Sequence, residues 1–387
     1  MIKTGSLTCC LVLCPLMLAA DTATESTPNE DGATDKLPVV YTVPLVGQMG
    51  TDIHEDLVEE VIEDIQTAQP DLIVFRINSQ DIGTNKHLPT YDWKEAGKFK
   101  MAEYRNMVQD LHTKLGHIDQ VVWIEDSVGF STLLAVAWDR LYMSEGARLY
   151  GLQNLYRMTQ NWSDEDIREK MEEAMEGQGR GFFEAGGRGK YARVLGNAMI
   201  DPEAKLSANF VGREVIWLPH TDGMWLVDDN PEQVANFDAV SALDTMLIQD
   251  TVGSLEDLVF VLGYREYEHN TQGDEIAEKY TSRWRSNYEK CKATYEDYQA
   301  DRGLGTTNDA RKILLAKRKM LEEVVKIMKR YSAVERRMAD EYRISINKLE
   351  FDIATLKDEI RQLKERGRGG SRGGGSGKTR GGGRGLN

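Results

Sequence analysis

Cysteine is scarce in this 387-residue sequence, which contains only four. Three of them lie within residues 1–20, a stretch that we expect to be removed as a signal peptide, so Cys291 is the single cysteine of the expected mature chain. One cysteine cannot form an intramolecular disulfide, and a disulfide-stapled fold is therefore excluded even in an oxidising compartment. Cys291 could still pair between two chains, but its place on the apolar face of an expected helix favours a buried thiol.

The sequence is also poor in long hydrophobic runs and in cofactor motifs. After residue 20, no apolar stretch is long enough to cross a bilayer. Neither a Walker-type nor a dinucleotide-binding glycine loop occurs. Among the six histidines, only His112 and His117, five residues apart, come near a metal-ligand spacing. We therefore expect no cofactor and no metal.

The first residues carry an export signal. Lys3 supplies the positive start, an apolar run extends from Cys9 to Leu18, and small residues close the segment at residue 20. Residues 21–37 are polar and acidic without an apolar period, and we expect a disordered linker there. These features predict export to the periplasm or cell envelope, with no transmembrane helix in the mature chain.

Charge is distributed unevenly along the chain. The formal net charge is −15, which argues against binding of nucleic acid by the folded part. Residues 366–387 carry five arginines and one lysine among many glycines, and we expect this tail to be disordered. Such a tail can bind RNA, anionic polymers or an acidic surface. In an exported acidic protein, polyanions of the cell envelope are the expected partners and nucleic acid is not.

Apolar periodicity between residues 38 and 265 alternates between strand and helix. Strands that alternate with helices predict a parallel sheet with right-handed crossovers, so we predict an α/β domain over 38–265. The strand runs are 39–46, 72–77 and 121–124, and the helical runs are 55–67 and 101–115.

Residues 275–365 show the pattern of long helices. We predict an α-helical coiled-coil arm there, broken by the glycine-containing segment 303–309 and helical again from Leu314 to Lys364. Its helices could form an antiparallel hairpin within the chain, a parallel oligomer, or both. The apolar positions are the stripe Tyr280, Trp284, Tyr288, Cys291, Tyr295, Tyr298 and the seam Leu349, Ile353, Leu356, Ile360, Leu363.

The stretch from Val121 to Gly151 organises the α/β region. An apolar strand is followed by a turn ending at Gly129 and by an apolar segment rich in small residues, Phe130 to Trp138. Strand, glycine turn and buried helix can present backbone N–H groups at a helix N-terminus, where negative charge such as an oxyanion is stabilised. A separate Gly/Arg-rich piece, residues 177–190, is predicted to be a mobile loop.

This stretch resembles the nucleophile segment of the Clp-protease/crotonase superfamily, and within it signal peptide peptidase A and the NfeD-type membrane-associated serine proteases. The match is carried by Ala137-Trp138-Asp139-Arg140-Leu141-Tyr142-Met143 and by the turn at Gly146. The resemblance implies a ClpP/crotonase-like spiral of ββα units. It also implies a serine nucleophile at the helix N-terminus, a lysine general base, and backbone N–H groups that form an oxyanion hole.

The residues that would carry catalysis depart from that pattern. Alignment without gaps back from Asp139 places Gly129 where those relatives carry serine, which indicates a degenerate site. Ser127 imitates a Ser-x-Gly turn two residues early. Ser131 lies inside the helix, where a serine hydroxyl commonly bonds a backbone carbonyl. Lys170 falls where the resemblance places the general base.

The oxyanion turn is altered as well. By the resemblance, Gly83, Gly129 and Phe130 occupy the turn and oxyanion-hole positions. Asp81 places a negative charge beside a developing oxyanion, which opposes acyl transfer.

Two functional hypotheses follow. The leading one is an exported serine-peptidase-like protein with a degenerate active site. It would act as an oligomeric scaffold or peptide-binding module in the cell envelope, with a peptide or protein ligand and self-association through the α/β domain and the helical arm. The alternative is an active Ser/Lys-dyad endopeptidase cleaving peptides or membrane-protein segments, with Ser127 or Ser131 as nucleophile and Lys170 as base.

Overall fold

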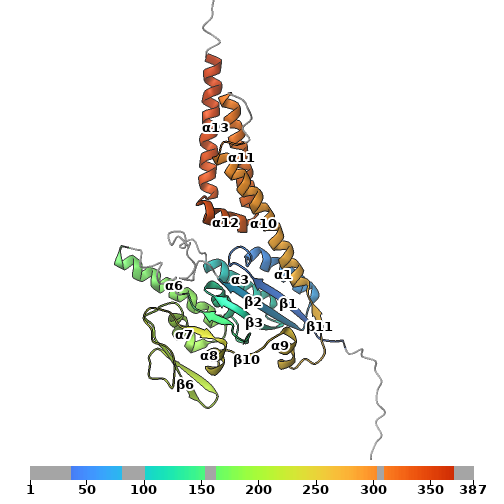
Figure 1. Ribbon diagram of the computed structural model, residues 1–387, viewed down its shortest axis with the longest axis vertical. Coiled ribbons are helices and arrows are strands. Elements are labelled where there is room, and N and C mark those ends of the chain that lie inside the picture. Colours follow the sequence, from blue (N-terminus) through green and yellow to red (C-terminus); the bar gives the residue numbers. More distant parts are fainter. Residues whose placement is uncertain (1–35, 81–100, 153–162, 303–308, 370–387) are drawn as a thin grey trace, which may run out of the picture. The chain divides into compact units, whose positions relative to one another are not determined.

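The computed structural model describes residues 36–80, 101–152, 163–302 and 309–369 (Figure 1). The expected signal peptide, Gly83 and the tail beyond Gly369 lie outside these ranges, and all elements named below belong to a compact unit that begins at Leu37.

The central element is an eight-stranded sheet in the order β10-β4-β3-β2-β1-β11, with β5 paired to β3 and β9 to β5. Its pairs are parallel except for β5 with β9, so the predicted α/β class with a parallel sheet is confirmed. The strands are β1 (Val39–Val46), β2 (Leu72–Gln80), β3 (Asp119–Val128), β4 (Leu141–Met143), β5 (Arg148–Tyr150), β9 (Asn236–Asp238), β10 (Asp250–Thr251) and β11 (Glu268–Asn270).

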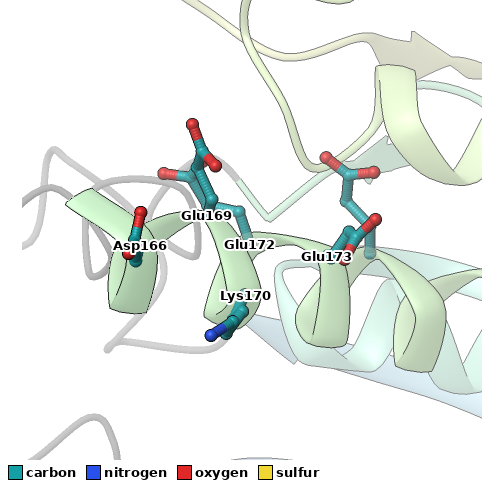
Figure 2. A pocket seen from close by; sticks show the side chains of 6 residues that line it. Asp166, Glu169, Lys170, Glu172 and Glu173 are labelled. Carbon is teal, nitrogen blue, oxygen red and sulfur yellow. The ribbon is translucent and has the colours of Figure 1, made fainter.

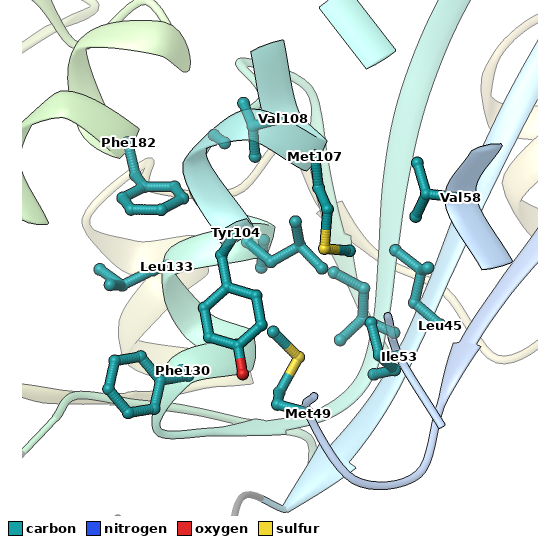
Figure 3. Packing of buried hydrophobic residues seen from close by; sticks show 14 of the residues in the cluster. Leu45, Met49, Ile53, Val58, Tyr104, Met107, Val108, Phe130, Leu133 and Phe182 are labelled. Atoms are coloured by element: carbon teal, nitrogen blue, oxygen red, sulfur yellow. The ribbon is translucent and has the colours of Figure 1, made fainter. Parts of the chain in front are cut away.

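The long strands of the sheet bury both faces, as their continuous apolar runs predict. On one face, Phe75 and Ile124 join a core with helices α1 (Glu55–Ala68) and α3 (Met101–Leu115). Figure 3 shows this core, in which Tyr104 and Met107 of α3 lie near Met49. On the other face, alternate strand residues form a smaller core with α9 (Leu255–Val261).

Helix starts follow from local chemistry. The His54 side chain accepts a hydrogen bond from the amide of Asp56 (3.1 Å) at the start of α1. Asp164 and Asp309 cap α6 (Glu165–Ala185) and α11 (Ala310–Arg330) in the same way. Each cap satisfies a backbone N–H that has no partner within the first turn.

A smaller antiparallel sheet has the order β7-β6-β8. Its strands are β6 (Leu206–Val211), β7 (Glu214–Leu218) and β8 (Trp225–Asp228). Helix α7 (Ala192–Ala198), preceded by a 3-10 turn at Gly189–Tyr191, packs on this sheet, whereas α8 (Ala239–Asp244) packs on β9 and β10 of the large sheet.

The prediction of a mobile loop over residues 177–190 is wrong. Helix α6 continues through most of this segment to Ala185. Two of its glycines serve close packing: a Cβ on Gly179 would collide with the Ile200 side chain, and one on Gly186 would collide with the Val136 carbonyl oxygen. Glycine here permits approach of backbone to its neighbours, which a composition pattern does not separate from flexibility.

The predicted long helices are present. They are α10 (Gln272–Gln299), α11, α12 (Ser332–Tyr342) and α13 (Ile346–Gly369). The aromatic stripe of α10 is buried from Tyr280 to Tyr295, Cys291 included as predicted, and its last member, Tyr298, is partly buried. Among the residues that the structure covers, no helix is both long and apolar enough to span a bilayer.

The seam predicted in α13 is filled within the chain. Leu349, Ile353 and Leu356 are buried, and α13 packs against α11. The expected continuous helix from Leu314 to Lys364 is interrupted at Tyr331, which has an extended backbone, and at Arg343, which is left-handed (φ 54°). Helix α13 also runs to Gly369, past the expected start of the disordered tail at residue 366.

Candidate functional site

The turn between β3 and α4 (Phe130–Ala135) has glycine at its apex. Gly129 precedes the first helical residue with φ 85° and ψ −131°, a conformation that residues with a Cβ rarely adopt. Its N–H donates to the Tyr150 carbonyl (3.1 Å). The position at which the resemblance implies a serine therefore holds no nucleophile.

Ser127 and Ser131 are brought together, but inside the protein. Both side chains are 0% exposed, and their hydroxyl oxygens lie 2.9 Å apart. Thr132 Oγ1 lies 3.2 Å from Ser127 Oγ and donates to the Tyr150 carbonyl (2.8 Å). We call these three residues the hydroxyl cluster.

The hydroxyl cluster connects three strands through backbone groups. Ser131 Oγ donates to the carbonyl of Ser79 (3.0 Å), which pairs with Ser127 across β2 and β3. Ser79 Oγ in turn donates to the carbonyl of Gly47 (2.6 Å), just after β1. A hydroxyl that already bonds backbone carbonyls in a closed interior fastens the sheet to α4.

Lys170 lies elsewhere, on the exposed surface of α6. It lines a hollow of about 480 Å³ with five carboxylate residues and no serine (Figure 2). Figure 2 shows the Lys170 side chain pointing away from that of Glu169. The carboxylate residues of the hollow are Asp166, Glu169, Glu172, Glu173 and Glu176.

The negative charge on this side of α6 is mutually repulsive. Burial raises the pKa of the Glu176 carboxyl, and the nearby charge of Asp201 raises it further. Burial also raises the pKa of Asp201, against a hydrogen bond from the Glu203 amide. In the described ranges, no group of three or more His, Cys, Asp or Glu residues is placed to hold a metal ion.

The remaining predicted site residues are Phe130 and Gly83. Phe130 is buried, with its ring centroid 5.8 Å from that of Tyr104, so its side chain anchors α4 in the core (Figure 3). Gly83 and Asp81 lie outside the described residues.

One polar feature next to the turn was not anticipated from the sequence. The register between β2 and β3 shifts after Ile77, which leaves Glu125 as a bulge. Glu125 accepts from Asn78 Nδ2 (3.0 Å), and Asp126 binds Arg148 through Nε (2.9 Å). The sequence signal for this bulge is the Glu125-Asp126 pair directly after an apolar strand run. Bulges of this kind redirect side chains and are common next to functional sites.

Comparisons with known proteins give no family. No protein-family model matches the chain, and no curated protein matches it.

Some solved structures are similar to parts of the chain. One is a mutant of the 1510-N membrane-bound stomatin-specific protease, with 12% identity, coverage of 61% of this chain and 97% of that one, and a TM-score of 0.37. Another mutant of that protease, in complex with a substrate peptide, has 11% identity, coverage of 63% and 98%, and a TM-score of 0.36. A peptidase from Plasmodium falciparum has 11% identity, coverage of 55% and 95%, and a TM-score of 0.32. Values this low assign no activity to the chain.

Proposed function

We propose that this chain is a peptidase-like protein without peptidase activity, which binds a peptide or protein segment as part of an oligomeric scaffold in the cell envelope. The observation that carries the proposal is the burial of Ser127 and Ser131. A nucleophile must contact the carbonyl carbon that it attacks and must lie within hydrogen-bond reach of its base. Both serines are closed off from solvent, and their hydroxyls are bonded to each other.

The position of Lys170 supports the same proposal. It is exposed on α6 beside carboxylates, whereas the two serines lie in the interior between β3 and α4. A Ser/Lys dyad needs both groups in one enclosed pocket, because the lysine must be desolvated to accept a proton near neutral pH.

The experiment that tests the lack of activity is labelling with a fluorophosphonate probe. The full chain, Ser127→Ala, Ser131→Ala and Lys170→Ala are incubated with the probe beside a known serine hydrolase. We expect no labelling of any form of the chain. Labelling that disappears in Ser127→Ala or Ser131→Ala and also in Lys170→Ala would overturn the proposal in favour of the Ser/Lys endopeptidase.

The envelope and oligomer parts of the proposal rest on the sequence. The export signal and the basic tail favour contact with envelope polyanions, an interaction that salt screens. We expect the full chain to bind an anionic polysaccharide at low salt, and a chain truncated after Gly369 to lose that binding. Light scattering on the purified chain measures the oligomer, and a monomer at all concentrations would remove the scaffold part.

A further inference from the structure

Strand β8 presents an open edge with apolar side chains. In the part of the chain that the structure describes, β8 pairs with β6 on one side only. Three successive side chains are exposed there: Met224 by 78%, Trp225 by 37% and Leu226 by 48%. An edge strand with apolar side chains and unpaired backbone groups is a template on which another strand can add.

The open edge is held in place before any partner arrives. The N–H of Gly223 donates to Ser207 Oγ (3.1 Å), and the N–H of Met224 donates to Asn209 Oδ1 (2.7 Å). Both acceptors belong to β6, so the turn leading into β8 is fastened to its neighbour strand. A preformed edge loses less conformational entropy when a peptide binds.

The length of the edge is limited. The register between β6 and β8 shifts between Leu206 and Ser207, which leaves Val227 outside regular pairing. The regular edge is therefore the short segment around Trp225 and Leu226, and it suits a short extended segment better than a whole added sheet.

The charged residues of the segment that carries the edge are all acidic. Residues 219–233 contain four acidic residues, Asp222, Asp228, Asp229 and Glu232, and no lysine or arginine. Asp228 is 7% exposed, and its Oδ2 has no hydrogen-bond partner within the described residues. Asp222 and Asp229, at the two ends of the edge, are exposed, and cationic groups on a partner would offset their negative charge.

The same charges oppose self-pairing. If two copies paired their β8 edges antiparallel about a twofold axis between Trp225 and Leu226, Asp222 of one copy would stand opposite Asp229 of the other. Like charges directly opposite each other destabilise a strand pair. A second copy is therefore a poor occupant, and a basic segment is a good one.

We propose that the β8 edge docks an extended peptide in which apolar residues are flanked at both ends by lysine or arginine. The peptide adds as a strand beside β8, its apolar side chains cover Trp225 and Leu226, and its basic ends lie near Asp222 and Asp229. This docking site rests on the proposed function of the chain as a peptide-binding protein, and it names the partner's chemistry and its place.

The test compares two labelled peptides on the full chain by fluorescence anisotropy. Both have the same alternating valine-threonine centre; one is flanked by lysines and the other by glutamates. We expect the lysine-flanked peptide to bind the wild-type chain at least about tenfold more tightly than the other. The double variant Asp222→Lys/Asp229→Lys should bind the glutamate-flanked peptide more tightly than the lysine-flanked one. Leu226→Lys should lower the affinity for the lysine-flanked peptide by about tenfold.

Val211→Lys is the matched control, because Val211 is 62% exposed on β6 of the same sheet but lies outside the β8 edge. It should leave both affinities unchanged. Equal binding of the two peptides, no binding, or an equal loss in Val211→Lys would overturn the docking site. Self-association that Leu226→Lys abolishes would overturn it in favour of a second copy. In each of these outcomes the absence of fluorophosphonate labelling still stands, so the two proposals fail separately.

Discussion

The hydroxyl oxygens of Ser127 and Ser131 lie 2.9 Å apart in the interior, one at the end of β3 and the other in the first turn of α4. The two side chains are buried and face each other instead of solvent. The contact joins strand to helix, so its loss should appear in stability.

Removal of the Ser131 hydroxyl should destabilise the fold. Ser131→Ala leaves the Ser79 carbonyl without its side-chain donor and removes one of the two hydroxyl partners of Ser127, at a cost of about 1–3 kcal/mol. Urea unfolding measures it. The control is Ser286→Ala, on the exposed surface of α10, where we expect a change within about 0.5 kcal/mol. Equal effects of the two substitutions would contradict a structural role for the hydroxyl cluster.

Replacement of Gly129 by alanine should also destabilise the chain. A Cβ at φ 85° and ψ −131° is strained, and we expect a loss of about 1–3 kcal/mol in the free energy of unfolding. Gly181 is the matched control, because it lies inside helix α6 with open space where its Cβ would be. There alanine should stabilise by about 0.5–1 kcal/mol through its better helix propensity. Thermal unfolding of both variants should thus give shifts of opposite sign, and shifts of the same sign would refute the strain.

Stability should fall at alkaline pH. Burial raises the pKa of the Cys291 thiol from 9.0 to about 12, and burial with a hydrogen bond to Glu341 raises the pKa of Tyr288 from 10.0 to about 12. In the folded chain both groups keep their protons to higher pH than in the unfolded chain. Their contribution is therefore complete below pH 9 and is lost as the pH rises to about 12.

Urea midpoints measured across that pH range provide the check. The decline should be smaller in Cys291→Ala than in the wild type, because the variant lacks one of the groups whose pKa is raised in the folded chain. The slope of the urea midpoint against pH is compared, and not the midpoint itself, because the lost packing in Cys291→Ala lowers the midpoint at every pH. A urea midpoint that does not change from pH 9 to 12 would contradict the expected dependence of stability on these protons.

The packing of the long helices makes a further prediction. Leu321 of α11 is fully buried, so Leu321→Ala should lose about 2–5 kcal/mol through lost contacts and a cavity. Phe351 of α13 is 72% exposed, and Phe351→Ala should change stability by no more than about 0.5 kcal/mol. Denaturant unfolding of the full chain distinguishes them. If Phe351→Ala is the costlier change, α13 buries a different face, against a partner outside the chain.

The sequence by itself determined which residues face a core. Runs of apolar residues marked β1 to β3, helical spacing marked α1 and α3, and the aromatic stripe marked the buried side of α10. Each of these signals comes from residues within a few positions of one another, where the period of the backbone decides the face. The glycine at position 129, where the resemblance implies a serine, was likewise visible in the sequence.

Tertiary structure alone decided what those faces meet. Ser131 bonds a carbonyl 52 residues away, and Lys170 lies on the surface in a hollow whose lining contains no serine, which no local period encodes. The apolar seam of α13 has the same sequence pattern whether its partner is a second chain or α11. The folded structure shows that α11 is the partner. Local patterns fix the direction of a side chain, whereas its partner depends on how distant segments pack, and in this protein that packing places the serines inside and the lysine outside.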